Sequence, residues 1–187
     1  MSVAPATEPD ACELPDAAEH TLLFSHLGRP DPLLRAVTDE GYTAPTPIQA
    51  RAIPPLLAGR DLLGQAQTGT GKTAAFALPL LCRIDPHVRA VQALVLVPTR
   101  ELALQVATAI HDYGKHMTHV SVLPVYGGES MTRQLSRLAR GVHVVVGTPG
   151  RVLDHLRRES LKLGQVRMVV LDEADEMLRM GFIDDVE

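Results

Sequence analysis

Two short stretches of this sequence combine residue types that can bind phosphate and a metal ion. The first reads Ala66-Gln67-Thr68-Gly69-Thr70-Gly71-Lys72-Thr73, between the apolar pair Leu62-Leu63 and a helix-compatible run at 74–78. Glycines let backbone N–H groups turn toward phosphate oxygens, and a helix N-terminus adds the positive end of its dipole. A lysine at this place can reach the outer phosphates, and a threonine hydroxyl can ligate Mg²⁺. We therefore expect a phosphate-binding loop at 66–73, although Ala66 stands where the common pattern has glycine, and a plain glycine-rich turn is the alternative.

The second stretch is acidic and reads Asp172-Glu173-Ala174-Asp175, directly after the apolar run 168–171. A carboxylate at the C-terminal tip of a buried strand is where the metal ligand of a nucleotide site belongs. Taken alone, an Asp-Glu pair could simply favour the first turn of a helix, because negative charge is stabilised at that end. Together with the loop at 66–73, it predicts a site for a nucleoside triphosphate and magnesium.

The composition is that of one domain with an acidic N-terminal extension. The chain has 187 residues, of which 45% are hydrophobic, and a formal net charge of −4. Residues 1–20 contain five acids and no Lys or Arg, so residues 21–187 carry a net charge of +1. We expect residues 1–20 to form a disordered tail because they lack a periodic apolar face. The remainder, residues 21–187, permits contact with a phosphate backbone without requiring it.

The same composition argues against a secreted or membrane protein. The N-terminal residues lack the basic start and apolar segment of a secretory signal. The chain also lacks a run of 18 apolar residues, so we expect no membrane contact. Cys12 and Cys82 are expected to be free thiols in a reducing compartment, which predicts a cytoplasmic location.

Strand and helix signals alternate along most of the chain. Asp31-Pro32 and Thr46-Pro47 each combine an N-cap residue with a proline at the first helical position, which predicts helices from Asp31 to Glu40 and from Thr46 to near Gly59. Further on, we expect strands at 61–65, 92–97, 119–125, 142–146 and 167–171, and helices at 72–83, 100–113, 129–140, 149–158 and 175–180. Short apolar runs separated by helices indicate an α/β fold with a parallel sheet covered by helices on both faces. Ligands bind beyond the carboxyl ends of the strands in such sheets, where both stretches above fall.

Three more loops at the same edge of the expected sheet offer N–H groups, hydroxyls and arginines. They contain Pro98, Thr99 and Arg100; Gly127 and Gly128; and Thr148, Pro149, Gly150 and Arg151. Threonine and proline can simply start a helix, but an arginine near the positive end of the helix dipole is unfavourable unless an anion lies close by. Together the loops predict a track for a sugar–phosphate backbone, bound independently of base sequence. Because no aromatic platform accompanies them, base stacking is not expected.

The order of these motifs resembles the N-terminal RecA-like domain of DEAD-box ATP-dependent RNA helicases of the bacterial type, which has a P-loop NTPase fold. The resemblance runs from Phe24 to Glu187 and includes Gln49. Phe24 with residues 41–49 is similar to the Q motif, 66–73 to motif I, and 172–175 to motif II. Residues 98–103 are similar to motif Ia, 127–128 to the GG motif, and 148–151 to motif Ib. Alanine is usual in that family at the position of Ala66, which removes the departure noted above.

The resemblance implies how the nucleotide would be held. Phe24 would stack on the adenine base and Gln49 would bind its edge, so the nucleotide would be ATP. The residues before Gln49 could also serve only to start a helix. The Gln49 amide nevertheless has the donor and the acceptor that adenine recognition needs. Lys72 would hold the β- and γ-phosphates, and Thr73 with Asp172 would place Mg²⁺.

The resemblance also implies roles in catalysis and RNA binding. Glu173 would orient and deprotonate the attacking water, and Asp175 would couple the nucleotide site to an interface with a second domain. The RNA strand would lie along the loops of motifs Ia, GG and Ib, at Arg100, Gly128, Thr148, Gly150 and Arg151.

Parts of the family pattern are expected to lie outside residues 21–187, which would form an incomplete N-terminal RecA-like domain. The chain ends twelve residues after Asp175, before the Ser-Ala-Thr motif III and the second RecA-like domain with its arginine fingers. Phosphoryl transfer without an arginine finger loses roughly 10³–10⁵ in rate, so this chain alone should turn over poorly. We expect an opening in the sheet between strands 61–65 and 167–171, where the motif III strand belongs. An inactive nucleotide- or RNA-binding module and a DNA translocase stay open as alternatives, the former disfavoured by Glu173.

Overall fold

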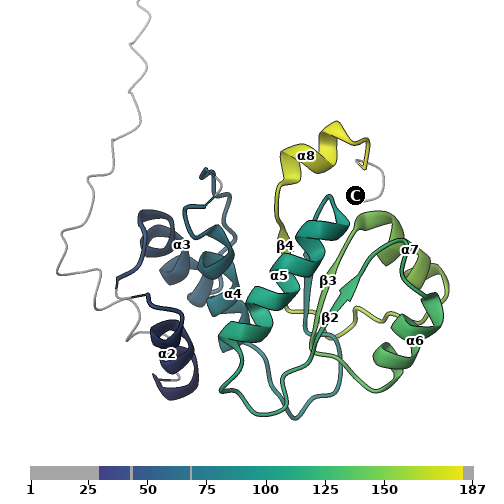
Figure 1. Ribbon diagram of the computed structural model, residues 1–187, viewed down its shortest axis with the longest axis horizontal. Coiled ribbons are helices and arrows are strands. Elements are labelled where there is room, and N and C mark those ends of the chain that lie inside the picture. The colour runs from purple at the N-terminus through teal and green to yellow at the C-terminus, as the bar shows by residue number, and fades with distance from the viewer. Residues whose placement is uncertain (1–29, 43, 68, 183–187) are drawn as a thin grey trace, which may run out of the picture.

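The structure, a computed structural model, describes residues 30–42, 44–67 and 69–182. Its elements are α2 (Pro30–Asp39), α3 (Pro47–Leu57), α4 (Lys72–Cys82), β1 (Ala93–Leu96), α5 (Arg100–Tyr113), β2 (Val122–Val125), α6 (Met131–Ala139), β3 (Val144–Gly147), α7 (Pro149–Arg157), β4 (Met168–Leu171) and α8 (Ala174–Arg179). Figure 1 shows α2, α3 and α4 on one side of the strands and α6 and α7 on the other. From α4 onward, the predicted ends differ from the observed ones by at most three residues. The tail expected at residues 1–20 lies outside the described residues.

The strands form one parallel sheet in the order β2-β3-β1-β4. β1 occupies the centre, with Leu94 level with Val145 of β3 and with Val169 of β4. Because all strands run the same way, their carboxyl ends meet at one edge, and the loops that follow them lie together there. The α/β fold class predicted from the apolar runs is confirmed.

Two apolar cores lie on the two faces of this sheet. On one face, Val95 and Val146 pack with α4 and α5, and Leu33 and Ile53 bring α2 and α3 into the same cluster. On the other face, Leu94, Leu96 and Val145 pack with Val152 of α7 and Met177 of α8. Every residue of β1 and β3 is buried, which is why these strands are apolar throughout rather than alternating.

Local signals explain where the helices begin. Thr99 is the N-cap of α5, and its hydroxyl accepts a hydrogen bond from Leu102 N at 3.2 Å. Pro47 and Pro149 stand in the first turns of α3 and α7, as predicted from their Thr-Pro pairs. α2 begins at Pro30, so the predicted start at Asp31 was one residue late. A proline fixes φ near its helical value, and Pro30 can open a helix as well as Pro32 can.

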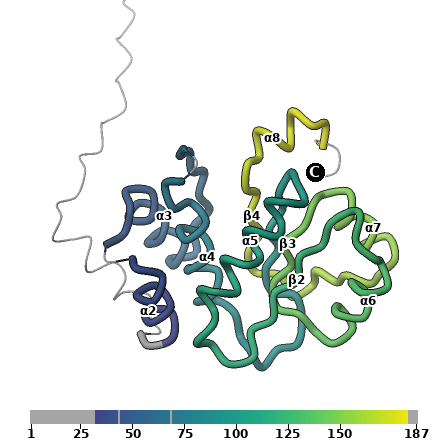
Figure 2. The backbone as a smooth tube through the Cα atoms, viewed as in Figure 1, coloured from purple at the N-terminus to yellow at the C-terminus, as the bar shows by residue number. Residues whose placement is uncertain are grey.

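The strand predicted at 61–65 is absent, and that prediction was wrong. Residues 61–67 have no regular structure, and Leu63 is fully exposed at 101%. A strand needs a neighbour for its backbone hydrogen bonds, but among the described residues β4 pairs only with β1. β4 is thus an edge strand, and its Val169 and Leu171 are 58% and 46% exposed. Figure 2 traces residues 61–67 as a loop between α3 and α4, separated from β4.

Candidate functional site

The glycine loop enters α4 through left-handed backbone. Gly69 and Gly71 have φ values of 83° and 88°, and Gly71 is the N-cap of α4. A glycine cap has no side chain to satisfy the first N–H groups of the helix, and α4 has no side-chain cap bond. Lys72 and Thr73 are the first two residues of α4. Free N–H groups, a lysine and a hydroxyl thus stand at one helix N-terminus, which is suited to an anion.

Gln49 connects α3 to this loop. It is 1% exposed, its Nε2 donates to the Gly71 carbonyl at 3.2 Å, and its Oε1 accepts from Thr46 N at 2.9 Å. A Cβ at position 71 would lie 2.5 Å from Gln49 Nε2, so the contact also depends on glycine. The buried Thr46 Oγ1 has no hydrogen-bond partner among the described residues. Gln49 therefore anchors the end of the phosphate loop, whereas its binding to adenine stays a prediction.

Asp172 lies at the carboxyl edge of the sheet, within reach of the charge of Lys72. Asp172 follows β4, and its N–H bonds to the Leu96 carbonyl of β1 at 3.0 Å. Burial raises the pKa of the Asp172 carboxyl above its ordinary value, while the charge of Lys72 and the N–H of Glu173 lower it. The charge of Lys72 thus acts on the Asp172 carboxyl, although the two residues are 100 positions apart in sequence.

The other acids after β4 differ in their surroundings. Glu173 is partly buried and adopts left-handed backbone, with φ 54° and ψ 46°. Asp175 is 76% exposed, and its carboxylate lies 3.7 Å from Arg179 Nη2 within α8. Glu173 thus turns the chain at the sheet edge, while Asp175 faces outward, where another part of a larger protein could contact it.

The residues present fit a magnesium ion bound together with phosphates. Magnesium is usually held by one or two carboxylates and by substrate phosphates rather than by a cage of protein ligands. In the described part of the chain, no cluster of three or more His, Cys, Asp or Glu side chains could hold a metal ion. Asp172 and Thr73 stay the predicted ligands at this edge of the sheet.

The loops of the predicted RNA track are brought together in part. The Arg100 guanidinium lies over the Tyr126 ring at 5.1 Å, and its Nη1 would be 3.6 Å from a Cβ at Gly128. Arg151 donates from Nη1 to the Glu129 carbonyl at 3.2 Å. The loops containing Arg100, Gly128 and Arg151 are therefore neighbours, while their contact with RNA stays a prediction.

The remaining residues of the predicted RNA track differ in whether their polar groups and backbone are free to contact a ligand. Pro98 and Pro149 are buried, and the Thr99 hydroxyl is already used as the cap of α5. Thr148 makes no side-chain cap bond, and its N–H is held by the Val125 carbonyl at 3.0 Å. A Cβ at Gly127 or Gly150 would meet open space. Thr148 and the two open glycines are thus available to a ligand in a way that the prolines and Thr99 are not.

Three residues of this region were missed by sequence reasoning. The Tyr126 ring lies under the Arg100 guanidinium. The buried Gln134 side chain bonds to Arg151, and the buried His155 bonds to Gln134. Tyr126 directly precedes the Gly127-Gly128 pair, so its position was a usable signal. Gln134 and His155 are 21 residues apart, and no local pattern relates them. Two predicted residues, Phe24 and Thr68, lie outside the described residues.

Acid should destabilise the chain through two buried histidines. His143 Nδ1 accepts from Ser121 N at 3.0 Å, and burial lowers the pKa values of both His143 and His155 from 6.5. The unfolded chain then binds more protons than the folded chain once the pH falls through about 6.5. We expect the free energy of unfolding to decrease from pH 7.5 to 5.5, by at most about 1.4 kcal/mol per pH unit for each histidine. Urea denaturation across this range measures the slope.

The double variant His143→Gln/His155→Gln serves as the control for this pH dependence. It should flatten the slope above pH 5.5, because glutamine does not titrate. Asp172 acts in the opposite direction at lower pH, since burial raises its pKa. An unchanged slope in the double variant would assign the effect to other groups.

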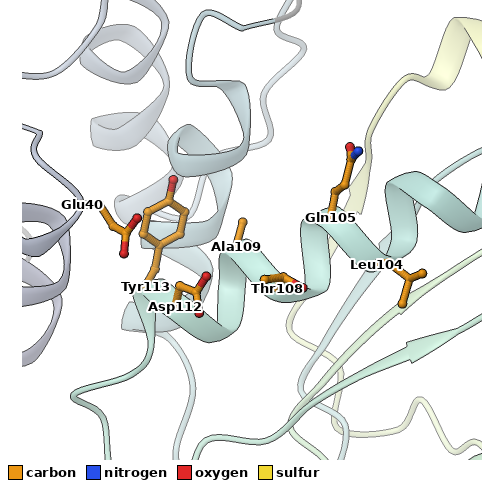
Figure 3. A pocket seen from close by; sticks show the side chains of 7 residues that line it. All are labelled: Glu40, Leu104, Gln105, Thr108, Ala109, Asp112 and Tyr113. Atoms are coloured by element: carbon orange, nitrogen blue, oxygen red, sulfur yellow. The ribbon is translucent and has the colours of Figure 1, made fainter.

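A hollow of about 450 Å³ lies away from these motifs, on the outer side of α5. Figure 3 shows it along one helix, with the Glu40 carboxylate beside the Tyr113 ring. It is lined by Glu40, Leu104, Gln105, Thr108, Ala109, Asp112 and Tyr113. Glu40 is paired with Lys115 at 3.3 Å. None of the predicted site residues lines this hollow, so it is not part of the candidate site.

Comparison with known proteins finds related sequences. The DEAD/DEAH box helicase family model matches residues 46–187. The chain is 60% identical over 170 residues to the ATP-dependent RNA helicase DeaD of Klebsiella pneumoniae, covering 91% of this chain and 26% of that protein. It is 55% identical over 164 residues to the DEAD-box ATP-dependent RNA helicase CshA of Bacillus cereus, covering 88% and 31%. The chain thus spans about a quarter to a third of the length of these relatives.

Solved structures agree with these matches. A DEAD box protein from the hyperthermophile Methanococcus jannaschii superposes with a TM-score of 0.79 at 44% identity, over 83% of this chain and 42% of that one. A hypothetical ATP-dependent RNA helicase from Sulfolobus tokodaii gives a TM-score of 0.75 at 40% identity, over 83% and 45%. Among the described residues, no helix combines the length and apolar character needed to cross a membrane.

Proposed function

Because the chain belongs to the DEAD/DEAH box helicase family, we propose that the whole protein is an ATP-dependent RNA helicase that separates short RNA duplexes. Residues 21–187 supply its N-terminal nucleotide-binding part and a portion of its RNA track. A second RecA-like domain would supply the rest of both sites, and RNA as substrate favours a cytoplasmic location. The chain's span of about a quarter to a third of its relatives fits this division.

One observation carries the proposal: a glycine loop with Gly71 as N-cap leads into Lys72 and Thr73 at the N-terminus of α4, and Asp172 follows β4 at the carboxyl edge of the sheet, near enough for the charge of Lys72 to lower its pKa. A cation at a helix N-terminus and a half-buried carboxylate beside it suit a phosphate chain with its metal ion. Lys72 would bind the outer phosphates, and Thr73 and Asp172 would hold Mg²⁺. Bound Mg²⁺ would neutralise charge that develops on the phosphates.

The residues after Asp172 would complete the chemistry. Glu173 would accept a proton from the water that attacks the γ-phosphate, and a carboxylate is a suitable base for this step. Asp175 is exposed and would contact the second domain. Gln49 and Phe24 would bind the adenine base, while 66–71 would surround the phosphates with N–H groups.

RNA would lie across the loops that contain Arg100, Gly128 and Arg151. Tyr126 carries Arg100 on its ring face, so the aromatic group positions a cation rather than stacking on a base. Contacts of N–H groups, hydroxyls and arginines to phosphate and ribose hold a strand without distinguishing its bases. The proposed substrate is therefore RNA of any sequence.

ATP turnover of the whole protein with RNA, with DNA and without polymer tests this proposal. We expect RNA to stimulate turnover and DNA of matched length to do so much less. Stimulation by DNA would favour a DNA translocase, and absence of turnover under all conditions would favour an inactive binding module.

Arg100→Ala tests the RNA track within the same assay. It should weaken RNA binding about 3- to 30-fold for unrelated sequences and reduce the salt dependence, as loss of a phosphate contact does, with ADP affinity unchanged. Arg167→Ala is the matched control, since Arg167 is exposed before β4 at the opposite end of the sheet. A loss confined to some RNA sequences would contradict backbone recognition.

A further inference from the structure

A buried amide, Gln134 on α6, joins the loops of the RNA track. Its side chain is fully buried at 0% exposure. Nε2 donates to the Tyr126 carbonyl at 3.1 Å and to Glu129 Oε2 at 2.9 Å. Oε1 accepts from Arg151 Nη1 at 3.2 Å and lies 2.8 Å from His155 Nε2. Each amide atom thus has two partners, which uses its full hydrogen-bonding capacity.

The hydrogen-bond partners determine the orientation of the Gln134 amide and the tautomer of the His155 imidazole. The Tyr126 carbonyl and the Glu129 carboxylate only accept, so the amide nitrogen must face them. The amide oxygen only accepts, so His155 must carry its proton on Nε2 and donate to it. His155 Nδ1 then faces the Ser160 hydroxyl at 2.9 Å. His155 is itself 0% exposed, and the Ser160 hydroxyl also donates to its carbonyl at 3.0 Å.

This arrangement determines what Arg151 can offer a ligand. Nη1 is used twice, by the Glu129 carbonyl and by Gln134 Oε1, both at 3.2 Å. Nε faces the Asp154 carboxylate at 3.8 Å, and the side chain keeps 16% exposure. Among the described residues, Nη2 has no hydrogen-bond or ion-pair partner. One nitrogen of the guanidinium is thus held ready for an outside acceptor such as a phosphate oxygen.

The same amide reaches the second arginine of the track through the backbone. Gln134 holds the carbonyl of Tyr126, and the ring of that tyrosine lies under Arg100. A shift of the 126–129 loop would therefore move Arg100 as well as Arg151.

We propose that Gln134 and His155 are positioning residues that hold Arg151, and through Tyr126 also Arg100, in the orientation that binds RNA. This inference rests on the proposed function, since it presumes that the two arginines contact an RNA backbone. Neither positioning residue touches RNA itself. A purely structural role for this network would lower stability without acting through Arg151.

A double-mutant cycle in the whole protein separates the two roles. Gln134→Met keeps the length of the side chain but removes both hydrogen-bonding atoms. We expect it to weaken binding of a fluorescent single-stranded RNA about 10-fold and to reduce the salt slope by about one, with ADP affinity unchanged. In the Arg151→Ala background it should cause at most about a 3-fold further loss, the remainder that acts through Arg100.

His155 supplies a second, milder test in case Gln134→Met does not fold. His155→Leu removes the donor to Gln134, whereas His155→Gln can still donate through its amide. We expect RNA affinity to fall about 3- to 10-fold in His155→Leu and to be largely restored in His155→Gln at equal urea stability.

The results also distinguish this inference from the proposed function. If Arg151→Ala binds RNA as tightly as the unchanged protein, the RNA track itself is wrong. If Arg151→Ala weakens binding but Gln134→Met and His155→Leu do not, or if their losses are as large without Arg151, only the positioning role is wrong.

Discussion

Replacing Glu173 by glutamine in the whole protein is expected to lower RNA-stimulated ATP hydrolysis by about 10²- to 10⁴-fold, while ATP and RNA still bind. Glutamine keeps the length of the side chain but cannot take a proton from water. Asp172 and Lys72 remain in place, so phosphate and metal binding should survive. Single-turnover hydrolysis and equilibrium binding of a labelled ATP measure the two properties separately.

The backbone turn at Glu173 should be unchanged in this variant. A residue other than glycine at φ 54° costs about 1–3 kcal/mol, and here the turn is held because the Glu173 carbonyl accepts from Glu176 N at 3.0 Å and Met177 N at 3.1 Å. Glutamine can adopt the same conformation, so the turn should persist. Glu176→Gln, three residues later in α8, is the control and should hydrolyse ATP normally. Turnover close to normal in Glu173→Gln would move the role of the base to another group.

Gly147→Ala should destabilise the chain by about 1–3 kcal/mol. Gly147 ends β3, where a Cβ would lie 2.5 Å from Val152 Cγ2 and 2.9 Å from the Val125 carbonyl oxygen. The second of these atoms belongs to the backbone of β2 and cannot turn away as a side chain can. The methyl group must therefore push α7 from the sheet, and Thr148 and Arg151 move with it. Urea denaturation of the 1–187 chain measures the loss.

Gly164→Ala is the matched control for this substitution. It makes the same chemical change in a turn where a Cβ meets nothing within 4 Å, so we expect an effect within about 0.5 kcal/mol. Equal stability of Gly147→Ala and Gly164→Ala would show that α7 can move away from β3 at little cost.

The parts of this fold that could be predicted from sequence are those with local signals. The apolar runs of β1 and β3 are buried on both faces, so their composition alone indicates a covered parallel sheet. Glycines with positive φ at 69 and 71 mark the phosphate loop in the sequence itself. Thr99 caps α5 where a Thr-Arg-Glu start is visible. The residues that specify each of these elements lie inside it or within a few positions of its ends.

The wrong strand prediction and the unpredicted site residues both depend on partners that are distant in the chain. Leu62-Leu63 is apolar enough for a strand, but no neighbouring strand among the described residues pairs with it. Gln134 and His155 meet because α6 and α7 each follow a neighbouring strand, β2 and β3. A polar residue on an otherwise ordinary helix carries no sign that it will be buried.

Gln49, if it binds the base as proposed, would couple base recognition to the loop. Its amide is 1% exposed and bonded once at each atom, to Gly71 and Thr46, so one N–H and one oxygen lone pair remain for a base. Because the loop already immobilises the amide, the base would find it oriented, and little side-chain entropy would be lost on binding. Any change that moves Gly71 would then weaken recognition of the base as well as the hold on the phosphates, although position 71 touches no part of the base.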